Sequence, residues 1–402
     1  MASLGIVEII SLLLSIAGFG LQPNPKPASA DAALAYAIPD ADLVVHLDVT
    51  SVVPANYKLL TALPNQPAIK ADPELAREMR EIVANVEGFR GMTKLMTGLD
   101  PATDISDATV SVQVTSTDDK PNVIVAVHGK ITQAVIDSIG KAVHAPVTKS
   151  GGGAMTQLDA KSSVAVTKDN TLLVGTTQLV KDRLADGWKA PSHAPGTNLG
   201  HAADMIATHP VLGASVTLSP TARQMIAAKG KKNALTDLAA RHKLAMLAVY
   251  HDGLGWSWID SSKQGLDAFA QMSDGMIDLL RAAQVAPRGV AKIAMGALES
   301  YRGTNKQVDE LLRHKDDLNK IMLAYTGDGQ FKVDRKLDAG KLRMDVRAVG
   351  KSASEVVPAG VILPLMAIGF IVERSSVRPP PPTMQIPAPA PPPAKPAPAP
   401  HK

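Results

Sequence analysis

Two tryptophans provide the first candidate binding surface in a chain of which only 3% is aromatic. Trp256 and Trp258 are two positions apart, so on a strand both rings point to the same side. Tyr250 lies in the preceding strand of the same expected hairpin, before the turn pair Asp252 and Gly253. The three rings form a candidate stacking platform for a sugar or a peptide. The alternative is that they pack as core residues beneath a helix.

Histidines recur at equal intervals in a polar stretch of the chain, at His193, His201 and His209. Because Asp204 follows His201 by three positions, the two would share one face of a helix and could bind a divalent ion with a third ligand from a loop. Histidines in polar loops are more often simply solvated. The sequence therefore predicts no metal site and no cofactor.

A second pair of titratable residues lies in an expected strand. His46 and Asp48 share one face of it and could act as an acid–base pair, although hydrogen-bonded neighbours of this kind are commoner. The chain has no Gly-x-Ser-x-Gly elbow, Walker loop, dinucleotide-binding glycine motif or His-Glu-x-x-His helix. The glycine run at 151–153 leads into a strand and indicates a hairpin connection. We predict no catalytic residues; the alternative is an enzyme of unrecognised class that uses scattered His and Asp side chains.

Composition excludes further classes of protein. The absence of cysteine removes disulfides, thiolate metal sites, cysteine nucleophiles and a lipid-modified cysteine. The formal charge of +4 lies mostly in residues 373–402, so the body lacks the one-signed field of a nucleic-acid-binding protein. We therefore expect no nucleic acid among the partners.

The first half of the body begins with a strand at 42–49 and a long helix at 73–96, which Pro73 opens and Gly98 closes. Alternation predicts strands at 109–114 and 123–127. The remaining expected elements of this half are a helix at 132–143, short strands near 154–158, 163–167 and 171–175, and a helix near 178–186.

The second half repeats this succession of strand, helix and hairpin after a connection at 187–210. Its expected elements are a strand at 212–218, helices from Pro220 and at 234–242, a hairpin of 244–250 with 255–260, long helices up to 325 and a last hairpin. In this last hairpin, residues 342–348 alternate between a buried and a solvent-exposed face. We predict an α+β fold with two modules, 31–190 and 205–350, each an antiparallel or mixed sheet covered by helices.

An apolar run at residues 4–21 has the length of a secretory signal core, and the tripeptide before Asp31 has the small-x-small pattern of a cleavage site. Glu8 and the lack of a basic residue before the run oppose this interpretation. Residues 1–30 are therefore predicted to be a signal peptide or an N-terminal anchor, with a helix packed on the body as the alternative.

A second apolar run, at residues 356–372, has the minimum length of a transmembrane helix and contains Pro358 and Pro364. It is a possible transmembrane segment; the alternative is a segment that packs on the body. Residues 374–402 are rich in proline and alanine and are predicted to form a disordered tail. The tail is either a spacer or a docking segment for a protein partner.

Three segments of the first half carry a resemblance to a known family: the stretch from Ile38 to Val49, the motif from Gly98 to Asp107 and the strand pair that ends at Lys130. They resemble uncharacterised exported α+β proteins of Gram-negative bacteria, myxobacteria especially. The resemblance covers residues 36–186 and implies export. That family has no known function, so the resemblance implies no catalytic residue.

Together these features predict a non-enzymatic binding or scaffold protein of the cell envelope. Its body would lie in the periplasm or on the outer face of the cytoplasmic membrane, tethered by residues 356–372. Membrane contact is expected through the terminal apolar segments, and self-association is possible through sheet edges or long helices. The alternative is a soluble cytoplasmic structural protein whose apolar ends pack within an assembly.

Overall fold

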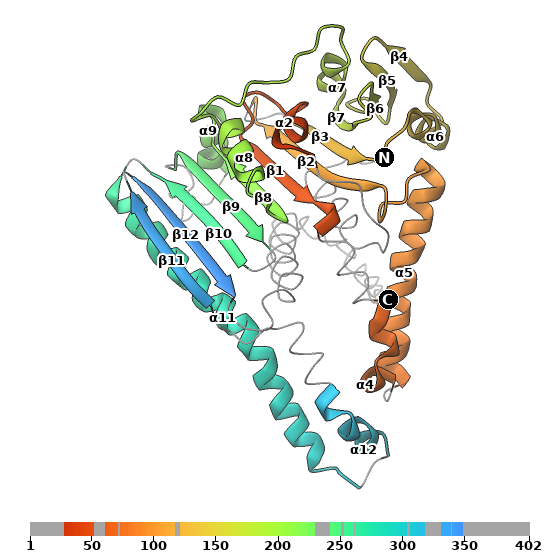
Figure 1. The fold of residues 1–402 in the computed structure, drawn as a ribbon, viewed down its shortest axis with the longest axis vertical. Helices are drawn as coiled ribbons and strands as arrows, with labels where there is room; N and C mark the ends of the chain where they lie inside the picture. Colours follow the sequence, from red (N-terminus) through yellow and green to blue (C-terminus); the bar gives the residue numbers. More distant parts are fainter. Residues whose placement is uncertain are drawn as a thin grey trace, which may run out of the picture.

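The computed structural model describes residues 28–51, 61–70, 73–116, 121–229, 242–250, 253–260, 262–303, 306–317, 331–338 and 340–348. The strands in these ranges form one antiparallel sheet of 12 strands, in the order β11-β12-β10-β9-β8-β1-β2-β3-β7-β6-β5-β4 (Figure 1). Their bounds are β1 Leu43–Asp48, β2 Ile105–Gln113, β3 Asn122–Gly129, β4 Val147–Ser150, β5 Gly153–Gln157, β6 Ser162–Thr167, β7 Leu172–Thr176, β8 Leu212–Val216, β9 Leu244–Tyr250, β10 Gly253–Ile259, β11 Phe331–Asp338 and β12 Lys341–Ala348.

Helices cover both sides of this sheet, and two of them extend beyond its lower end in Figure 1. The long helix α11 has 37 residues and is therefore about 55 Å long, whereas α5 has 25 residues. The helices are α2 Ala30–Leu34, α4 Pro67–Lys70, α5 Pro73–Thr97, α6 Gln133–Val143, α7 Thr177–Arg183, α8 Asn198–Ile206, α9 Pro220–Lys229, α11 Lys263–Glu299 and α12 Lys306–Arg313, with a 3-10 turn at Leu63–Asn65.

The alternation of side chains gives the sheet two faces with different coverings. Face 1 carries Leu47, Val110 and Val125 at its centre, α6 over the first half and α11 over the second. Face 2 carries Val44 and Leu173, which pack with α2, α7 and α8. Because most of the central strands are buried on both faces, they are rich in Val, Ile and Leu.

The two halves of the chain repeat one strand order within this single sheet. The order β1-β2-β3-β7-β6 in the first half matches β8-β9-β10-β12-β11 in the second. The halves join where β1 pairs antiparallel with β8, from Leu43 opposite Val216 to Leu47 opposite Leu212. The α+β class with antiparallel strands is as expected, but one continuous sheet replaces the expected sheet for each module.

Most expected elements are present with shifts of a few residues at their ends. The connection predicted at 187–210 instead contains helix α8, and the short strand β4 had no counterpart among the expected elements. Gly98 ends α5 with φ at +75°, as its position after the helix requires. The buried and solvent-exposed faces predicted for β12 are confirmed. Leu342, Met344 and Val346 are at most 1% exposed, whereas Arg343 between them is exposed.

The N-terminal part of the described chain is attached firmly to the body. Ser29 caps α2 by accepting a hydrogen bond from Ala32 N, and Ala28 N donates to Asp107 Oδ2 at 2.8 Å. Ala28 and Ala30 also pack on the apolar cluster of face 2.

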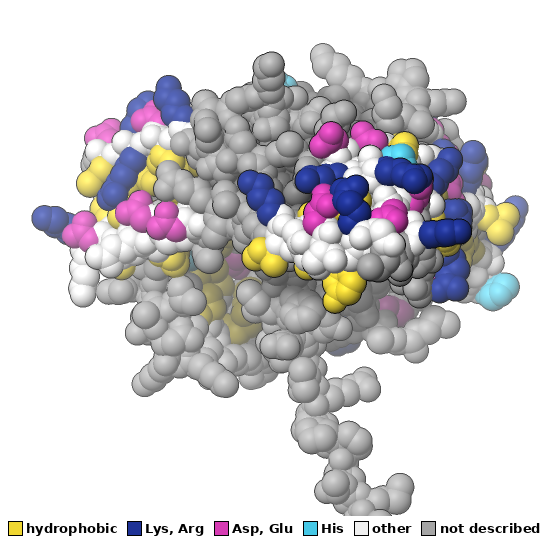
Figure 2. Space-filling view, turned by 90° about the horizontal axis from the view of Figure 1, so that it is seen from below, with side chains coloured by type: hydrophobic (Ala, Val, Ile, Leu, Met, Phe, Trp, Pro, Cys, Tyr) yellow, Lys and Arg dark blue, Asp and Glu magenta, His cyan; other side chains and the backbone are white. Residues whose placement is uncertain are grey.

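The helix expected at 234–242 falls largely outside the described residues, and the apolar runs 4–21 and 356–372 and the tail 374–402 fall outside them completely. Within the described part, no helix combines the length and the apolar character that crossing a bilayer requires. Lysine and arginine side chains are interspersed with acidic ones on the face seen in Figure 2.

Candidate functional site

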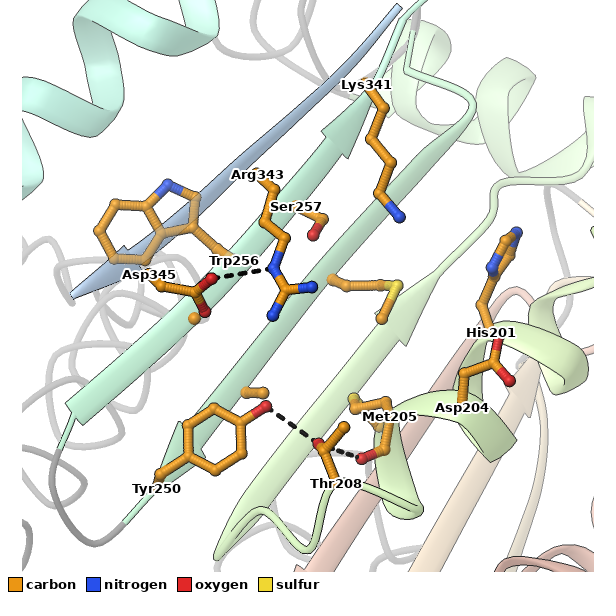
Figure 3. A pocket seen from close by; sticks show the side chains of 13 residues that line it. His201, Asp204, Met205, Thr208, Tyr250, Trp256, Ser257, Lys341, Arg343 and Asp345 are labelled. Atoms are coloured by element: carbon orange, nitrogen blue, oxygen red, sulfur yellow. Dashed lines mark hydrogen bonds and ion pairs between the residues drawn. The ribbon is translucent and has the colours of Figure 1, made fainter. Parts of the chain in front are cut away.

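The candidate site is a polar groove on face 2 of the second half, between α8 and strands β9, β10 and β12 (Figure 3). It encloses about 280 Å³. Its lining residues are His201, Asp204, Met205, Thr208, Met246, Ala248, Tyr250, Gly255, Trp256, Ser257, Lys341, Arg343 and Asp345.

Small residues of β10 form the floor of the groove. Gly255 and Ser257 point to face 2, opposite Asp345 and Arg343 of β12. A Cβ on Gly255 would lie 2.9 Å from Asp345 Oδ1, so a larger side chain at this position would fill the groove. The hollow therefore exists because this strand presents almost no side chain to face 2.

One wall of the groove is fixed by a hydroxyl pair. The Tyr250 and Thr208 hydroxyls lie 3.0 Å apart, and the Thr208 hydroxyl donates to the Met205 carbonyl at 2.7 Å. The Arg347 guanidinium lies 4.3 Å from the centre of the Tyr250 ring, in the geometry of a cation–π contact. These contacts join α8 to β9 and β12 and hold the Tyr250 ring at the end of the groove.

The groove carries four formally charged side chains, of which two are paired with each other. Arg343 Nε donates to Asp345 Oδ2 at 2.9 Å, and the terminal guanidinium nitrogens point into the hollow in Figure 3. Among the described residues, Lys341 and Asp204 have neither a hydrogen-bond nor an ion-pair partner. The unpaired charges therefore have opposite signs, one on β12 and one on α8.

His201 lies on α8 beside both unpaired charges. Burial lowers the pKa of His201, the positive charge of Lys341 lowers it further, and Asp204 opposes the shift. The ring is therefore neutral at pH 7, where it can donate one hydrogen bond and accept another.

The structure places the Trp256 and Trp258 rings on face 1, beneath α11, where they are 5% and 7% exposed. Trp258 stacks on Phe269 at 4.4 Å between ring centres, with 15° between the planes. Trp256 Nε1 donates to Ser273 Oγ at 2.8 Å. Both rings thus belong to the core, which was the alternative to a stacking platform.

Tyr250 is on the other side of the sheet from the two tryptophans. It faces Gly253 in the hairpin, whereas Leu247 faces Trp256, so the Tyr250 ring projects from face 2. The structure does not bring the three rings of the candidate platform together. Only Tyr250 contributes its side chain to the groove, and Trp256 lines it from the floor strand.

His46 and Asp48 share face 2 of β1 but make separate bonds. The buried His46 Nδ1 lies 3.0 Å from Thr109 Oγ1. Burial lowers the pKa of His46, although the negative charges of nearby carboxylates act to raise it. Asp48 accepts hydrogen bonds from the Thr50 hydroxyl and the Ser51 amide at 2.6 and 3.1 Å. The two side chains therefore hold local structure.

Asp107 is the centre of a buried polar cluster that no local sequence pattern indicates. Its carboxylate lies 2.8 Å from His128 Nδ1 and also accepts bonds from the Ser106 hydroxyl and the Ala28 amide, each at 2.8 Å. Burial favours a raised pKa, but the bond and charge of His128 together with the bonds from Ala28 and Ser106 lower the pKa of Asp107 below its usual value. This ionised carboxylate attaches the N-terminal segment to β2.

The histidines considered as metal ligands are dispersed. His201 and Asp204 both lie on helix α8, where a connection was expected, but His193 Nδ1 lies 3.4 Å from Asp31 Oδ1. His209 follows α8 with φ at +54°. No group of three or more potential metal ligands occurs in the described part of the chain.

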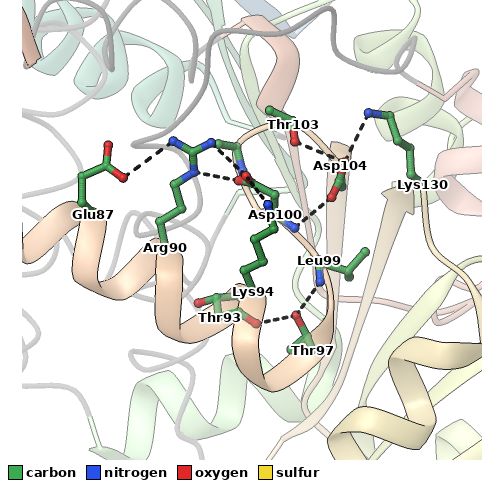
Figure 4. A network of polar contacts seen from close by, with 11 residues as sticks. Glu87, Arg90, Thr93, Lys94, Thr97, Leu99, Asp100, Thr103, Asp104 and Lys130 are labelled. Carbon is green, nitrogen blue, oxygen red and sulfur yellow. Dashed lines mark hydrogen bonds and ion pairs between the residues drawn. The ribbon is translucent and has the colours of Figure 1, made fainter.

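The motif at 98–107 is a structural junction between α5 and the sheet (Figure 4). Arg90 donates to both oxygens of Asp100 at 2.9 and 2.8 Å, and the Asp100 amide donates to Asp104 Oδ2. Although burial favours a raised pKa, the bond from Arg90, the Ala102 amide and the positive charges of Arg90 and Lys94 together hold the pKa of Asp100 below its usual value. A Cβ on Gly129 would lie 1.9 Å from the Asp104 carbonyl oxygen, so glycine is required there.

The fold and the groove define an antiparallel α+β protein with an open polar site on one half of its sheet. No protein-family model and no curated protein matches the chain. The comparison with solved structures found crystal form I of TP0453, with a TM-score of 0.35 and 10% sequence identity, covering 83% of this chain and 97% of that chain. A similarity of this size carries no argument about function.

Proposed function

We propose that this chain is a non-enzymatic binding protein of the cell envelope. Its two-module body lies outside the cytoplasmic membrane, residues 356–372 form the apolar helix that tethers it, and residues 374–402 form a disordered tail. The groove between α8 and β12 is its binding site.

The observation that carries the binding role is a difference between the equivalent faces of the two halves. On face 2 of the first half, Ile124, Ala165 and Leu173 are at most 1% exposed beneath helices. At the equivalent strands of the second half, β12 presents Lys341 and Arg343, which are exposed. A hollow lined by apolar side chains with a few charged groups is typical of a ligand site, whereas the equivalent face of the first half is filled by the helices that cover it.

A cluster of exposed apolar side chains supports the scaffold part of the proposal. Met92, Leu95 and Met96 lie within about one turn of α5 and are 54%, 86% and 44% exposed. Contiguous exposed apolar residues are typical of surfaces that contact another protein or a membrane.

Fractionation of cells that express the full chain tests the envelope location. We expect the protein in the membrane fraction, released by detergent but not by high salt, and a variant that lacks residues 349–402 in the soluble extracytoplasmic fraction. Recovery of the full chain in the cytosol without detergent would overturn the location. N-terminal sequencing adds a second readout. Cleavage of a signal peptide predicts a mature chain that begins at Asp31, whereas an N-terminal anchor keeps Ala28 and Ser29 with their bonds to the body.

A further inference from the structure

The charges of the groove indicate the chemical class of its ligand. We propose that the groove binds a small zwitterion of the amino-acid class, with the carboxylate at Lys341 and Arg343 and the ammonium group at Asp204. The proposal rests on the binding role argued above but not on the envelope location.

The carboxylate end is defined by two cations on one strand. Lys341 and Arg343 are two positions apart on β12, so their backbones are about 7 Å apart on the same face. Arg343 uses Nε for Asp345 and keeps its terminal nitrogens directed into the hollow. A carboxylate between the two cations would accept charge-assisted hydrogen bonds from both.

The ammonium end is defined by the exposed carboxylate on the opposite wall. Asp204 is on α8 and has no partner within the described part of the chain. Figure 3 shows His201 between Asp204 and Lys341, and both charges affect the pKa of His201. A ligand with a single charge would satisfy only one of the two unpaired groups, whereas a zwitterion satisfies both.

The remaining wall favours an apolar side chain on the ligand. Met205 and Ala248 are 2% and 7% exposed and line the groove together with Met246 and Tyr250. The volume of about 280 Å³ fits a ligand of amino-acid size. Leucine, methionine and phenylalanine have side chains of matching polarity and size.

Calorimetric titration of the full-length protein in detergent tests the proposal with L-leucine, L-methionine and L-phenylalanine. Two analogues of leucine separate its charges: 4-methylpentanoate lacks the ammonium group and 3-methylbutylamine lacks the carboxylate. We expect binding of at least one amino acid and about ten-fold weaker binding of both analogues, because each loses one charge-assisted contact.

Matched variants locate the two contacts. Lys341→Gln and Asp204→Asn should each weaken amino-acid binding about ten-fold. Lys149→Gln on the edge strand β4 and Asp137→Asn on α6 should leave it unchanged, since both residues are exposed and away from the groove. All four positions are on the surface, and circular dichroism verifies that the variants are folded.

Three results would overturn the proposal. The first is that none of the three amino acids binds at millimolar concentration. The second is that leucine and 4-methylpentanoate bind equally and the Asp204→Asn variant binds as the original protein does. The third is that phosphoethanolamine binds and the amino acids do not. If one of these results is obtained and the protein is still found in the membrane fraction, only the proposed ligand class is rejected. If the protein is found in the cytosol and binds leucine, only the proposed location is rejected.

Discussion

The burial of the two tryptophans leads to a quantitative prediction about stability. Trp258→Ala removes a ring that is 7% exposed and stacked on Phe269. We expect a loss of about 3 to 5 kcal/mol in the free energy of unfolding, as for other buried aromatic residues replaced by alanine. The stacked pair accounts for about 0.5 to 1.5 kcal/mol of this loss.

Trp256→Phe separates the polar contact from the apolar one at the neighbouring position. The variant keeps an aromatic ring but leaves the hydroxyl of Ser273, which is 0% exposed, without its indole donor. An unsatisfied buried group costs about 1 to 3 kcal/mol. Tyr301→Ala is the control, because Tyr301 is 60% exposed and should change stability by less than about 0.5 kcal/mol.

Urea unfolding followed by far-ultraviolet circular dichroism measures these differences without depending on tryptophan fluorescence. The expected order of stability is the original protein and Tyr301→Ala together, then Trp256→Phe, then Trp258→Ala. If Trp258→Ala unfolds at the same urea concentration as the original protein, the ring is not a core residue.

Three further predictions concern the polar contacts of the first half. Asp100→Asn should cost about 2 kcal/mol in urea unfolding, because the charge-assisted bonds from Arg90 are lost; an unchanged midpoint would contradict this. In the chain that keeps residues 1–30, Ser29→Ala should cost about 0.5 to 1 kcal/mol through loss of the α2 cap, and no change would show that the cap is not formed. Burial lowers the pKa of His46 in the folded protein below 6.5, its ordinary value, so the unfolded chain binds a proton more readily. The free energy of unfolding should therefore fall as the pH decreases below 6.5. The lowered pKa of Asp107 adds a second loss below about pH 4, and a flat profile of urea midpoint against pH would refute both assignments.

Local patterns were sufficient to predict most elements of this fold. The alternation in β12 and the helix bounds set by Pro73 and Gly98 are confirmed. Helix α8 was missed because proline, glycine and histidine dominate the residues around it. The pattern Leu199, Ala202, Met205 and Ile206, which recurs at helical spacing after the cap residue Thr197, was the signal that could have found it.

The groove could not be predicted because its walls come from distant parts of the chain. The wet face of β12 was recognised from Arg343 and Asp345, but nothing local shows that α8 lies across the sheet from them. Similarly, no feature of β1 indicates whether its second edge pairs with β8 or remains open. Sequence patterning defines which face of an element is apolar, whereas the neighbour of that face depends on the tertiary arrangement.

The junction of β1 with β8 has a consequence for how the protein folds during synthesis. β1 leaves the ribosome early, yet one of its edges remains unpaired until Leu212–Val216 has been synthesised. Contacts between residues so distant in sequence form slowly, and an exposed strand edge can pair with other chains in the meantime. A nascent first half should therefore depend on a chaperone, or on rapid completion of translation, to avoid aggregation.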